Sequence, residues 1–231
     1  MIDKTCLLED LRPRFKDGMT VMVGGFGVPG TPFTLIDALL EAGAGGLTLI
    51  KNEANEDHLG LSKLIEAGQA KKLITSHLGL NATVIGMMNR KEIEVEFYPQ
   101  GILAEKIRAG GAGLQGILTD IGIDTILAQN KELATVNGQR AMIEPALRAD
   151  VALIHAAAAD AFGNLVYEKS ARNFNPAMAT AARIVIAEAE RLAAPGELAP
   201  DVIHTPGGFV DHVVVLDQLS DDYGILEHHV L

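Results

Sequence analysis

The fold is decided by residues 17–32, DGMTVMVGGFGVPGTP, in which a short apolar run leads into a glycine-rich loop. Thr20–Val23 has the composition of a buried strand. The loop Gly24–Gly30 follows, and Thr31 then predicts a helix N-cap with Pro32 at the first helical position. The stretch therefore predicts a strand, a tight glycine loop and a helix in direct succession.

Strands and helices are predicted to alternate through the first half of the chain. The expected strands after the first are 47–50, 72–76 and 93–98, and the expected helices are 32–43, 59–67 and 83–89. Because strands separated by short helices are typical of a parallel arrangement, we expect an α/β fold with an open, mostly parallel sheet flanked by helices.

The second half predicts further strands around turn signals. Expected features are a glycine-rich loop at 110–114, a hairpin at 133–142 with an Asn-Gly turn, a turn and strand at 161–167, and buried strands at 151–154, 184–186 and 213–215. The sequence contains no internal repeat and no clear linker, which predicts a single domain over residues 1–217. Residues 218–231 are acidic and aperiodic and predict a peripheral C-terminal tail.

Composition limits the classes of protein that fit. With 231 residues, 48% of them hydrophobic, the chain can bury a sizeable core, which excludes a disordered protein. The formal charge of −11 argues against general nucleic-acid binding, which needs a basic surface. A single cysteine excludes an internal disulfide framework. The sequence has no apolar stretch of the roughly 20 residues needed for a membrane span, so we expect a cytoplasmic protein.

The glycine loop also satisfies a dinucleotide-binding pattern. Gly25–Gly30 reads G-x-G-x-x-G between a strand and a helix, and Glu53 ends the next strand, where a ribose-binding acid belongs. Pro29 and Pro32 each remove a backbone donor that a bound pyrophosphate would use, which weakens this hypothesis. A tight turn without any ligand is the simplest structural interpretation.

A longer sequence pattern favours a third interpretation of the glycine loop, besides a dinucleotide site and a turn without a ligand. Every fixed position from Asp17 to Pro32 resembles the signature of the family I coenzyme A transferases, in its α-subunit form. The resemblance covers roughly residues 5–215 and continues in the same order through residues 98–101 (YPQG), 110–114 (GGAGL), 148–150 (RAD), 162–165 (FGNL), 171–176 (ARNFNP), 205–207 (TPG) and 210–211 (VD).

The resemblance implies a NagB/RpiA/CoA transferase-like fold and a definite chemistry. Such enzymes move coenzyme A from an acyl thioester to a short-chain carboxylate or 3-oxoacid, through a glutamyl anhydride and a glutamyl-CoA thioester in ping-pong order. The nucleophilic glutamate belongs to the β subunit, in a Ser-Glu-Asn-Gly motif that this chain lacks. A β subunit is therefore the implied partner, in an αβ or α2β2 assembly. The CoA thioester is a substrate, and no permanently bound cofactor is implied.

The resemblance also assigns the candidate site. Gln100 matches the family glutamine whose side-chain amide donates to the oxyanion, although a strand-end amide that satisfies a loop is the structural alternative. A coenzyme A or carboxylate site is implied for the loop, that is, for Gly24, Gly25, Phe26, Gly27, Val28, Pro29 and Gly30. Phe26 at the loop tip is expected to exclude water from the anhydride, unless it packs in the core.

Other polar residues are weaker candidates. Glu53 is a possible nucleophile, but a glutamate at a strand end is usually solvated. Arg172 and Asn173 lie in the ARNF motif, and Arg172 is expected to have a structural role, paired with an internal carboxylate or with a partner chain. Asp124 replaces a family glycine, and its charge is expected to repel a carboxylate acceptor. The histidines show no metal-ligand spacing, so no metal is implied.

Two other functions stay open at this point. A nicotinamide dinucleotide oxidoreductase would use the same glycine loop. A non-catalytic ligand-sensing domain of the same fold is the other possibility, although this chain has no DNA-binding appendage.

Overall fold

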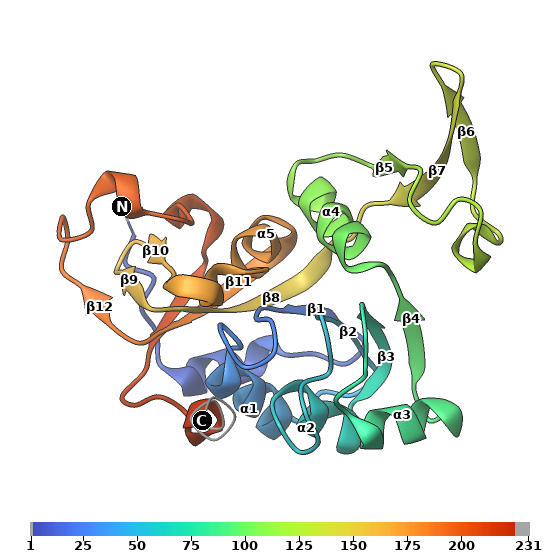
Figure 1. Ribbon diagram of the computed structural model, residues 1–231. Helices are drawn as coiled ribbons and strands as arrows, with labels where there is room; N and C mark the ends of the chain where they lie inside the picture. Colours follow the sequence, from blue (N-terminus) through green and yellow to red (C-terminus); the bar gives the residue numbers. More distant parts are fainter. Residues whose placement is uncertain (1, 225–231) are drawn as a thin grey trace.

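Seven parallel strands form the central sheet of the structure, a computed structural model that describes residues 2–224 (Figure 1). Every neighbouring pair in this sheet is parallel, which confirms the predicted open sheet. In order across the sheet, the strands are β13 (His212–Val215), β11 (Ala182–Ala189), β8 (Ala149–Ala156), β1 (Thr20–Val23), β2 (Leu47–Ile50), β3 (Ala70–Thr75) and β4 (Glu94–Phe97).

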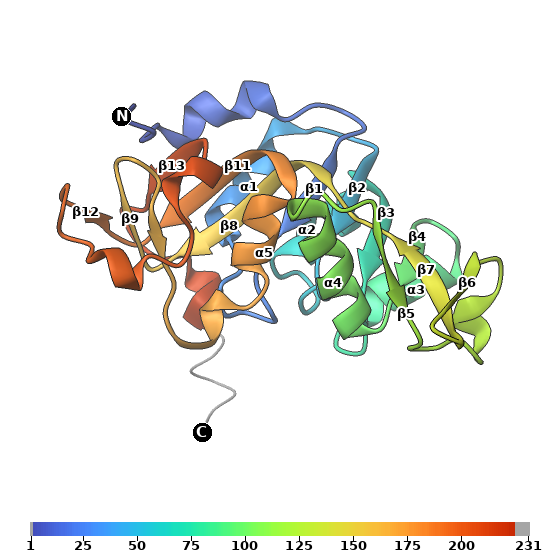
Figure 2. The same cartoon turned by 90° about the horizontal axis from the view of Figure 1, so that it is seen from above.

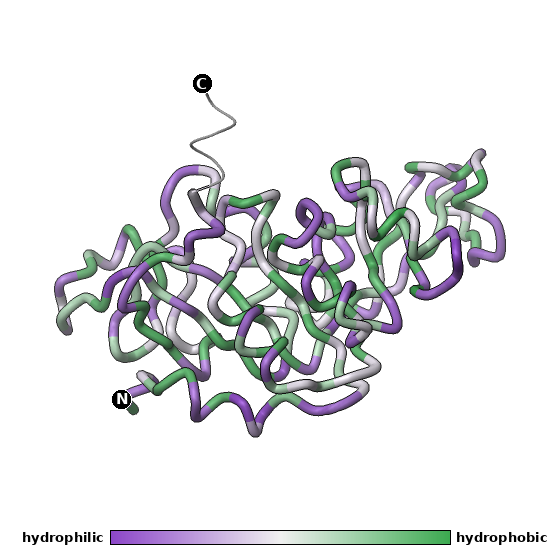
Figure 3. The backbone as a smooth tube through the Cα atoms, turned by 90° about the horizontal axis from the view of Figure 1, so that it is seen from below, coloured by the Kyte–Doolittle hydropathy of each residue, from purple (hydrophilic) through white to green (hydrophobic). Residues whose placement is uncertain are grey.

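Helices cover both faces of the sheet (Figure 1). One face carries α1 (Phe33–Ala42), α2 (Leu61–Glu66) and α3 (Ala82–Asn89), and the other carries α4 (Gln100–Gly111) and α5 (Asn175–Thr180). The period-2 alternation of a strand explains this arrangement, because Val21 and Val23 pack into the core under α1 while Met22 packs into the core under α4 and α5. Hydrophobic segments accordingly run through the interior of the molecule (Figure 3).

A three-stranded antiparallel sheet projects from the body as an arm (Figure 2). It contains β5 (Gly116–Thr119), β7 (Gln139–Pro145) and β6 (Leu133–Val136). The predicted hairpin is confirmed, since Asn137 and Gly138 both have positive φ, at 52° and 79°, as a two-residue hairpin turn requires.

Short elements complete the chain. A second three-stranded sheet contains β10 (Leu165–Val166), β9 (Ala158–Asp160) and β12 (Leu192–Ala193). The 3-10 helices are η1 (Leu8–Arg14), η2 (Ile126–Ala128), η3 (Lys169–Arg172), η4 (Pro200–Val202), η5 (Gly207–Phe209) and η6 (Asp221–Gly224). No helix within residues 2–224 has both the length and the apolar character that crossing a membrane demands.

The glycine-rich loop predicted at 110–114 is partly wrong. Gly110 and Gly111 are the last residues of α4, and both are glycines because another segment lies against them. A Cβ at Gly110 would stand 2.0 Å from the carbonyl oxygen of Leu147, and one at Gly111 would stand 1.9 Å from Oγ1 of Thr180 in α5. Close helix packing therefore explains these glycines, rather than a loop conformation.

The predicted N-cap of α1 is also wrong. The helix begins at Phe33, and the Thr31 hydroxyl donates to the carbonyl oxygen of Gly27 at 2.7 Å instead of capping the helix. A carboxylate from β11 takes the capping role, because Glu188 accepts the N–H of Leu35 at 3.0 Å and is fully buried. The helix start is thus tied to both the glycine loop and the sheet.

The C-terminal segment packs against the body as far as it is described. Asp222 in η6 lies 2.8 Å from the Lys63 ammonium, and Tyr223 packs edge-on against Phe33 with ring centroids 4.8 Å apart. The Tyr223 hydroxyl also donates to the carbonyl oxygen of Thr31. Residues 225–231 of the predicted tail lie outside the described part of the chain, and the boundary at residue 217 stays a prediction.

Candidate active site

The carboxyl ends of four neighbouring strands bring the candidate residues to one edge of the sheet. The glycine loop follows β1, the segment 51–55 follows β2, Ser76 follows β3, and Gln100 lies just beyond β4. Because these strands are parallel, the four segments meet at the same edge. Ligand sites of open α/β sheets lie in this position.

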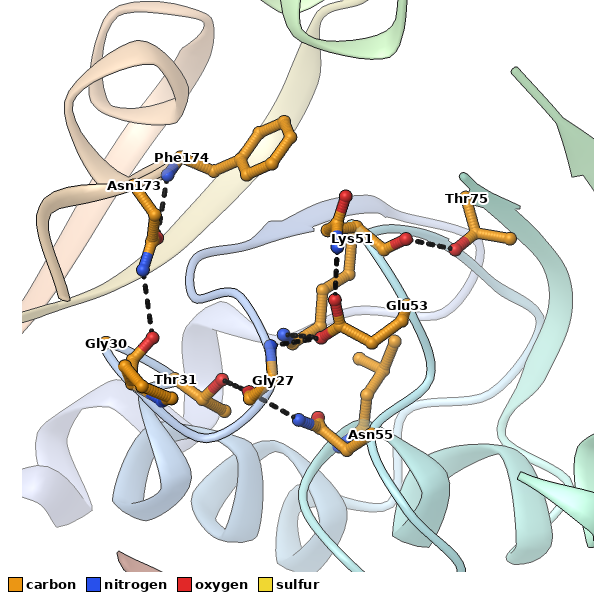
Figure 4. Close-up of polar contacts among 12 residues, drawn as sticks. Gly27, Gly30, Thr31, Lys51, Glu53, Asn55, Thr75, Asn173 and Phe174 are labelled. Atoms are coloured by element: carbon orange, nitrogen blue, oxygen red, sulfur yellow. Dashed lines mark hydrogen bonds and ion pairs between the residues drawn. The ribbon is translucent and has the colours of Figure 1, made fainter. Parts of the chain in front are cut away.

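The tip of the glycine loop is held by side chains from the segment after β2 (Figure 4). The N–H of Gly27 donates to Oε1 of Glu53 at 3.0 Å. The carbonyl oxygen of Gly27 accepts from Nδ2 of Asn55 at 2.8 Å and from the Thr31 hydroxyl. Both polar groups of one loop residue are therefore fixed, which positions the loop before any substrate arrives.

Two asparagines from a distant segment hold the other end of the loop. Nδ2 of Asn173 donates to the carbonyl oxygen of Pro29 at 2.9 Å (Figure 4), and Nδ2 of Asn175 donates to that of Gly30 at 3.0 Å. Asn173 therefore clamps the loop. Asn175 was not singled out from the sequence as a site residue. Its place in the ARNFNP motif, next to Asn173, is the signal that could have identified it.

Close contacts explain why the loop is rich in glycine. Gly25 has φ of 98°, and a Cβ there would stand 2.8 Å from the backbone nitrogen of Thr31. Gly30 has φ of 72°, and a Cβ there would stand 2.4 Å from the carbonyl oxygen of Ala171. These glycines are needed for the backbone conformation and packing of the loop itself.

The two apolar side chains of the loop have different surroundings. Phe26 at the tip is 45% exposed, so the alternative that it packs in the core is wrong. Val28 is buried in a small apolar cluster with Phe33 and Leu59, partly covered by Tyr223. Phe26 is therefore the loop side chain that faces the space over the sheet edge.

Gln100 is the first residue of α4, so it lies at a helix start and not at a strand end, although its amide does bond a loop residue as the structural alternative expects. Its Nε2 donates to Oδ1 of Asn52 at 2.9 Å. Nδ2 of Asn52 in turn donates to Oε2 of Glu53, whose other oxygen accepts the N–H of Gly27. A continuous chain of hydrogen bonds thus joins the predicted oxyanion donor to the predicted glycine loop.

Glu53 is buried, and the expectation that it is solvated is wrong. Glu53 is 5% exposed and Lys51 is 0% exposed, and Oε1 of Glu53 lies 2.6 Å from the Lys51 ammonium. Burial lowers the pKa of Lys51, while the Glu53 carboxylate opposes that change. The Glu53 oxygens are occupied by Lys51, Asn52 and Gly27, so this carboxylate is placed to hold neighbours and not to attack a substrate.

The remaining candidates lie in other surroundings. Asp124 is in the arm, 3.5 Å from Arg140, and its backbone is outside the positive-φ region, so no glycine conformation is needed there. The predicted repulsion of a carboxylate acceptor by Asp124 stays a prediction. Among residues 2–224, His, Cys, Asp and Glu side chains form no group of three or more that could hold a metal ion.

A glycine loop fixed by side-chain hydrogen bonds and the amide of a helix-start glutamine meet at the carboxyl edge of a parallel sheet, where open α/β proteins have their ligand sites. The sequence model of the Coenzyme A transferase family matches residues 8–216, and the chain belongs to this family. The predicted resemblance is confirmed. Neither the dinucleotide oxidoreductase nor the sensing domain receives support from these comparisons.

Individual relatives agree with the family. The chain is 51% identical over 200 residues to a probable coenzyme A transferase subunit alpha of Bacillus subtilis, covering 86% of this chain and 87% of the relative. It is 46% identical to the acetate CoA-transferase subunit alpha of Escherichia coli, covering 93% and 98%. A crystal structure of an acyl-CoA transferase from Escherichia coli O157:H7, in a thioester complex with CoA, shares the fold with a TM-score of 0.84 and 23% identity. That match covers 95% of this chain and 48% of the other, so this chain spans about half its length.

Proposed function

We propose that this chain is the α subunit of a heteromeric coenzyme A transferase that moves CoA from an acyl-CoA to a short-chain carboxylate or 3-oxoacid. The nucleophilic glutamate lies on a β subunit, in an αβ or α2β2 assembly. Two observations support this division: the relatives over nearly their full length are α subunits, and Ser-Glu-Asn-Gly does not occur in this chain.

The observation that carries the proposal is the hydrogen-bonded link between Gln100 and the glycine loop. When a carboxylate attacks a thioester carbonyl, negative charge develops on the carbonyl oxygen, and preorganised donors lower that barrier. Gln100 Nε2 has two N–H groups and donates to Asn52 with one, which leaves the second for the oxyanion. A carboxamide keeps this role at every pH because it does not titrate.

The loop supplies the other side of the pocket. Its N–H groups at Phe26 and Gly27 are bonded to the carbonyl oxygen of Pro29 and to Glu53, so these donors fix the shape of the loop, whose backbone forms a wall of the pocket. Exposed Phe26 covers the reacting atoms and excludes water from the anhydride, which would otherwise be hydrolysed.

The surroundings of the loop are compatible with a small anionic substrate. A cavity of about 50 Å³ lies beside the loop, lined by Val28, Glu53, Leu59, Leu78 and neighbouring residues but not by Gln100. It holds only a few non-hydrogen atoms, since a cavity that binds benzene measures about 150 Å³. Lys51 neutralises the buried Glu53, which limits repulsion of an anionic substrate in a chain of net charge −11.

Transfer proceeds in two balanced halves. The β-subunit carboxylate attacks the acyl carbonyl and CoA leaves as a thiolate, which then attacks the glutamyl carbonyl and releases the donor carboxylate. The acceptor carboxylate then attacks the glutamyl-CoA thioester and releases the CoA thiolate. The thiolate attacks the acceptor's acyl carbonyl in the new anhydride, which gives the product acyl-CoA and frees the glutamate. CoA thioesters are substrates, no cofactor is permanently bound, and we assign the enzyme to the cytoplasm, where its one cysteine, Cys6, stays unpaired.

Native mass spectrometry of the protein purified gently from its own cells tests the proposal. We expect a second, different chain in equal number and, after incubation with acyl-CoA, a gain on that chain of the mass of CoA less one water. Initial rates should show the parallel double-reciprocal lines of ping-pong kinetics. A pure homo-oligomer, or a CoA adduct on this chain, would contradict the division of labour.

A further inference from the structure

The chain of hydrogen bonds from Glu53 to Gln100 has a direction. A carboxylate only accepts hydrogen bonds, whereas a carboxamide has one accepting and one donating end. Oε2 of Glu53 therefore requires the NH2 end of Asn52, and this turns Oδ1 of Asn52 toward Gln100. That oxygen in turn requires the NH2 end of Gln100. Oγ of Ser76 lies 2.9 Å from Oδ1 of Asn52 and 2.8 Å from the Asn52 carbonyl oxygen, and because a hydroxyl can donate or accept, the Glu53 carboxylate is the group that sets the orientation.

The other oxygen of Glu53 acts on the loop. Oε1 accepts the N–H of Gly27 at 3.0 Å and the ammonium of Lys51 at 2.6 Å. Lys51 and Glu53 are both buried, so the pair is isolated from solvent and its geometry is retained. One carboxylate is thus linked to both halves of the proposed oxyanion pocket, directly to Gly27 and through Asn52 to Gln100, while the Lys51–Glu53 pair adds no net charge.

We propose that Glu53 is a positioning residue that sets the orientation of the Gln100 amide through Asn52 and holds Gly27 in place, with Lys51 as its neutralising partner. This inference rests on the proposed function of Gln100 as oxyanion donor. A glutamate just beyond a strand end is usually solvated, and the inference explains why Glu53 is instead buried in an ion pair with Lys51.

The direction of the chain allows a test by exchanging its donors and acceptors. Glu53→Gln places an NH2 group against the NH2 group of Asn52. Asn52→Asp places a carboxylate against a carboxylate. The double variant Asn52→Asp with Glu53→Gln restores one donor and one acceptor, because the amide introduced at position 53 donates to the carboxylate introduced at position 52. That carboxylate still accepts from Gln100 and Ser76, and the total charge of the pair is also restored.

We expect each single variant to lower kcat in the complex with the β subunit by about ten- to a hundredfold, with the KM for acyl-CoA changed by less than about threefold. The double variant should return kcat to within about threefold of the wild type. Glu144→Gln is the matched control, since it removes another buried carboxylate, paired with Lys106 at 2.6 Å and with Lys131 at 2.8 Å, and none of these residues takes part in the hydrogen bonds from Glu53 to Gln100. That variant should keep the wild-type kcat.

A second readout separates this inference from the proposed function. In the complex labelled with 15N-glutamine, the side-chain amide signal that Gln100→Ala removes should exchange its hydrogens more slowly in the wild type than in Glu53→Gln, and the double variant should return to the wild-type rate. If the wild type has no transferase activity but shows this exchange pattern, the proposed function is refuted and the positioning role of Glu53 is supported. If the wild type is active but the double variant stays as impaired as the single variants, the positioning role is refuted. The same conclusion follows if the variants leave the Gln100 exchange unchanged.

Discussion

Oδ1 of Asn175 lies 1.8 Å from the point where a Cβ on Gly24 would stand, although the two residues are 151 positions apart in the sequence. Asn175 also donates to the carbonyl oxygen of Gly30 and accepts the N–H of His155 at 3.2 Å. The first glycine of the loop is therefore required by the side chain that clamps the last one.

Gly24→Ala is expected to displace Asn175 and to lower the free energy of unfolding by about 3 kcal/mol, because overpacking adds to the loss of buried hydrogen bonds. Urea denaturation of the purified chain measures this. Gly208→Ala is the control, since nothing lies within 4 Å of a Cβ there. Equal stability of the two variants would show that Asn175 moves without cost.

Gln100→Ala is expected to lower kcat by about 10²–10³-fold while the subunits still assemble, because one oxyanion donor is lost from an exposed helix start. Gln100→Glu should be at least as slow, since a carboxylate cannot donate and repels the oxyanion. Steady-state kinetics of the assembled complex, with native mass spectrometry as the assembly check, measures both. Wild-type turnover in Gln100→Ala would remove this residue from the mechanism.

Local patterns predicted the strands and the hairpin because a few neighbouring residues determine them. Thr20–Val23 is apolar between two turns, and Asn137 with Gly138 supplies two adjacent positive-φ positions. The helix α4 was not predicted, and Gly110 and Gly111 at its end are read locally as a loop. Their real cause is contact with Leu147 and Thr180, which a local pattern does not contain.

Local patterns likewise indicated only those candidate site residues that lie in contiguous motifs. The loop and Gln100 followed from contiguous motifs, whereas the clamp of Asn173 on Pro29 spans 144 positions and is set by the fold. The burial of Glu53 also depends on the fold. Lys51 and Glu53 are two residues apart, but β2 ends at Ile50 and the chain bends at Asn52, so a strand pattern does not predict that they pair.

Stability is expected to fall as the pH rises above neutrality because of His155. Burial alone would lower the pKa of its imidazole, but hydrogen bonds to Glu188 and Glu190 outweigh burial and raise the pKa to about 9. A folded-state pKa above the unfolded value of about 6.5 stabilises the protein fully below pH 6.5, and this contribution is lost as the pH passes 9. The resulting decrease in the free energy of unfolding is about 3 kcal/mol at most.

Urea denaturation at pH 6, 7.5 and 9.5 measures this decline. Glu190→Gln removes one partner, 3.1 Å from Nε2 of His155, and should move the decline to lower pH. Stability that is equal at pH 6 and 9.5 would contradict a protonated His155 in the folded state.

Ending the chain after Ser220 is expected to lower the free energy of unfolding by about 2 kcal/mol, because the packing of Tyr223 on Phe33 and the ion pair of Asp222 with Lys63 are lost. Ending it after Gly224 keeps these contacts and serves as the control. Thermal unfolding of the two truncated chains measures the difference. A tail that is peripheral from residue 218 onward would make the two forms equally stable.

Phe26→Ala is expected to raise the ratio of acyl-CoA hydrolysis to transfer by about tenfold, which corresponds to about 1.4 kcal/mol in relative barriers. The side chain is 45% exposed at the loop tip, so its removal should open the anhydride to water with little loss of stability. Phe209→Ala removes an equally exposed ring, at 46%, from η5 and controls for the loss of an apolar surface group. Release of free CoA without an acceptor, compared with product formation in its presence, gives the ratio. If the two variants hydrolyse acyl-CoA equally slowly, Phe26 does not protect the intermediate, and the exclusion of water must come from the β subunit.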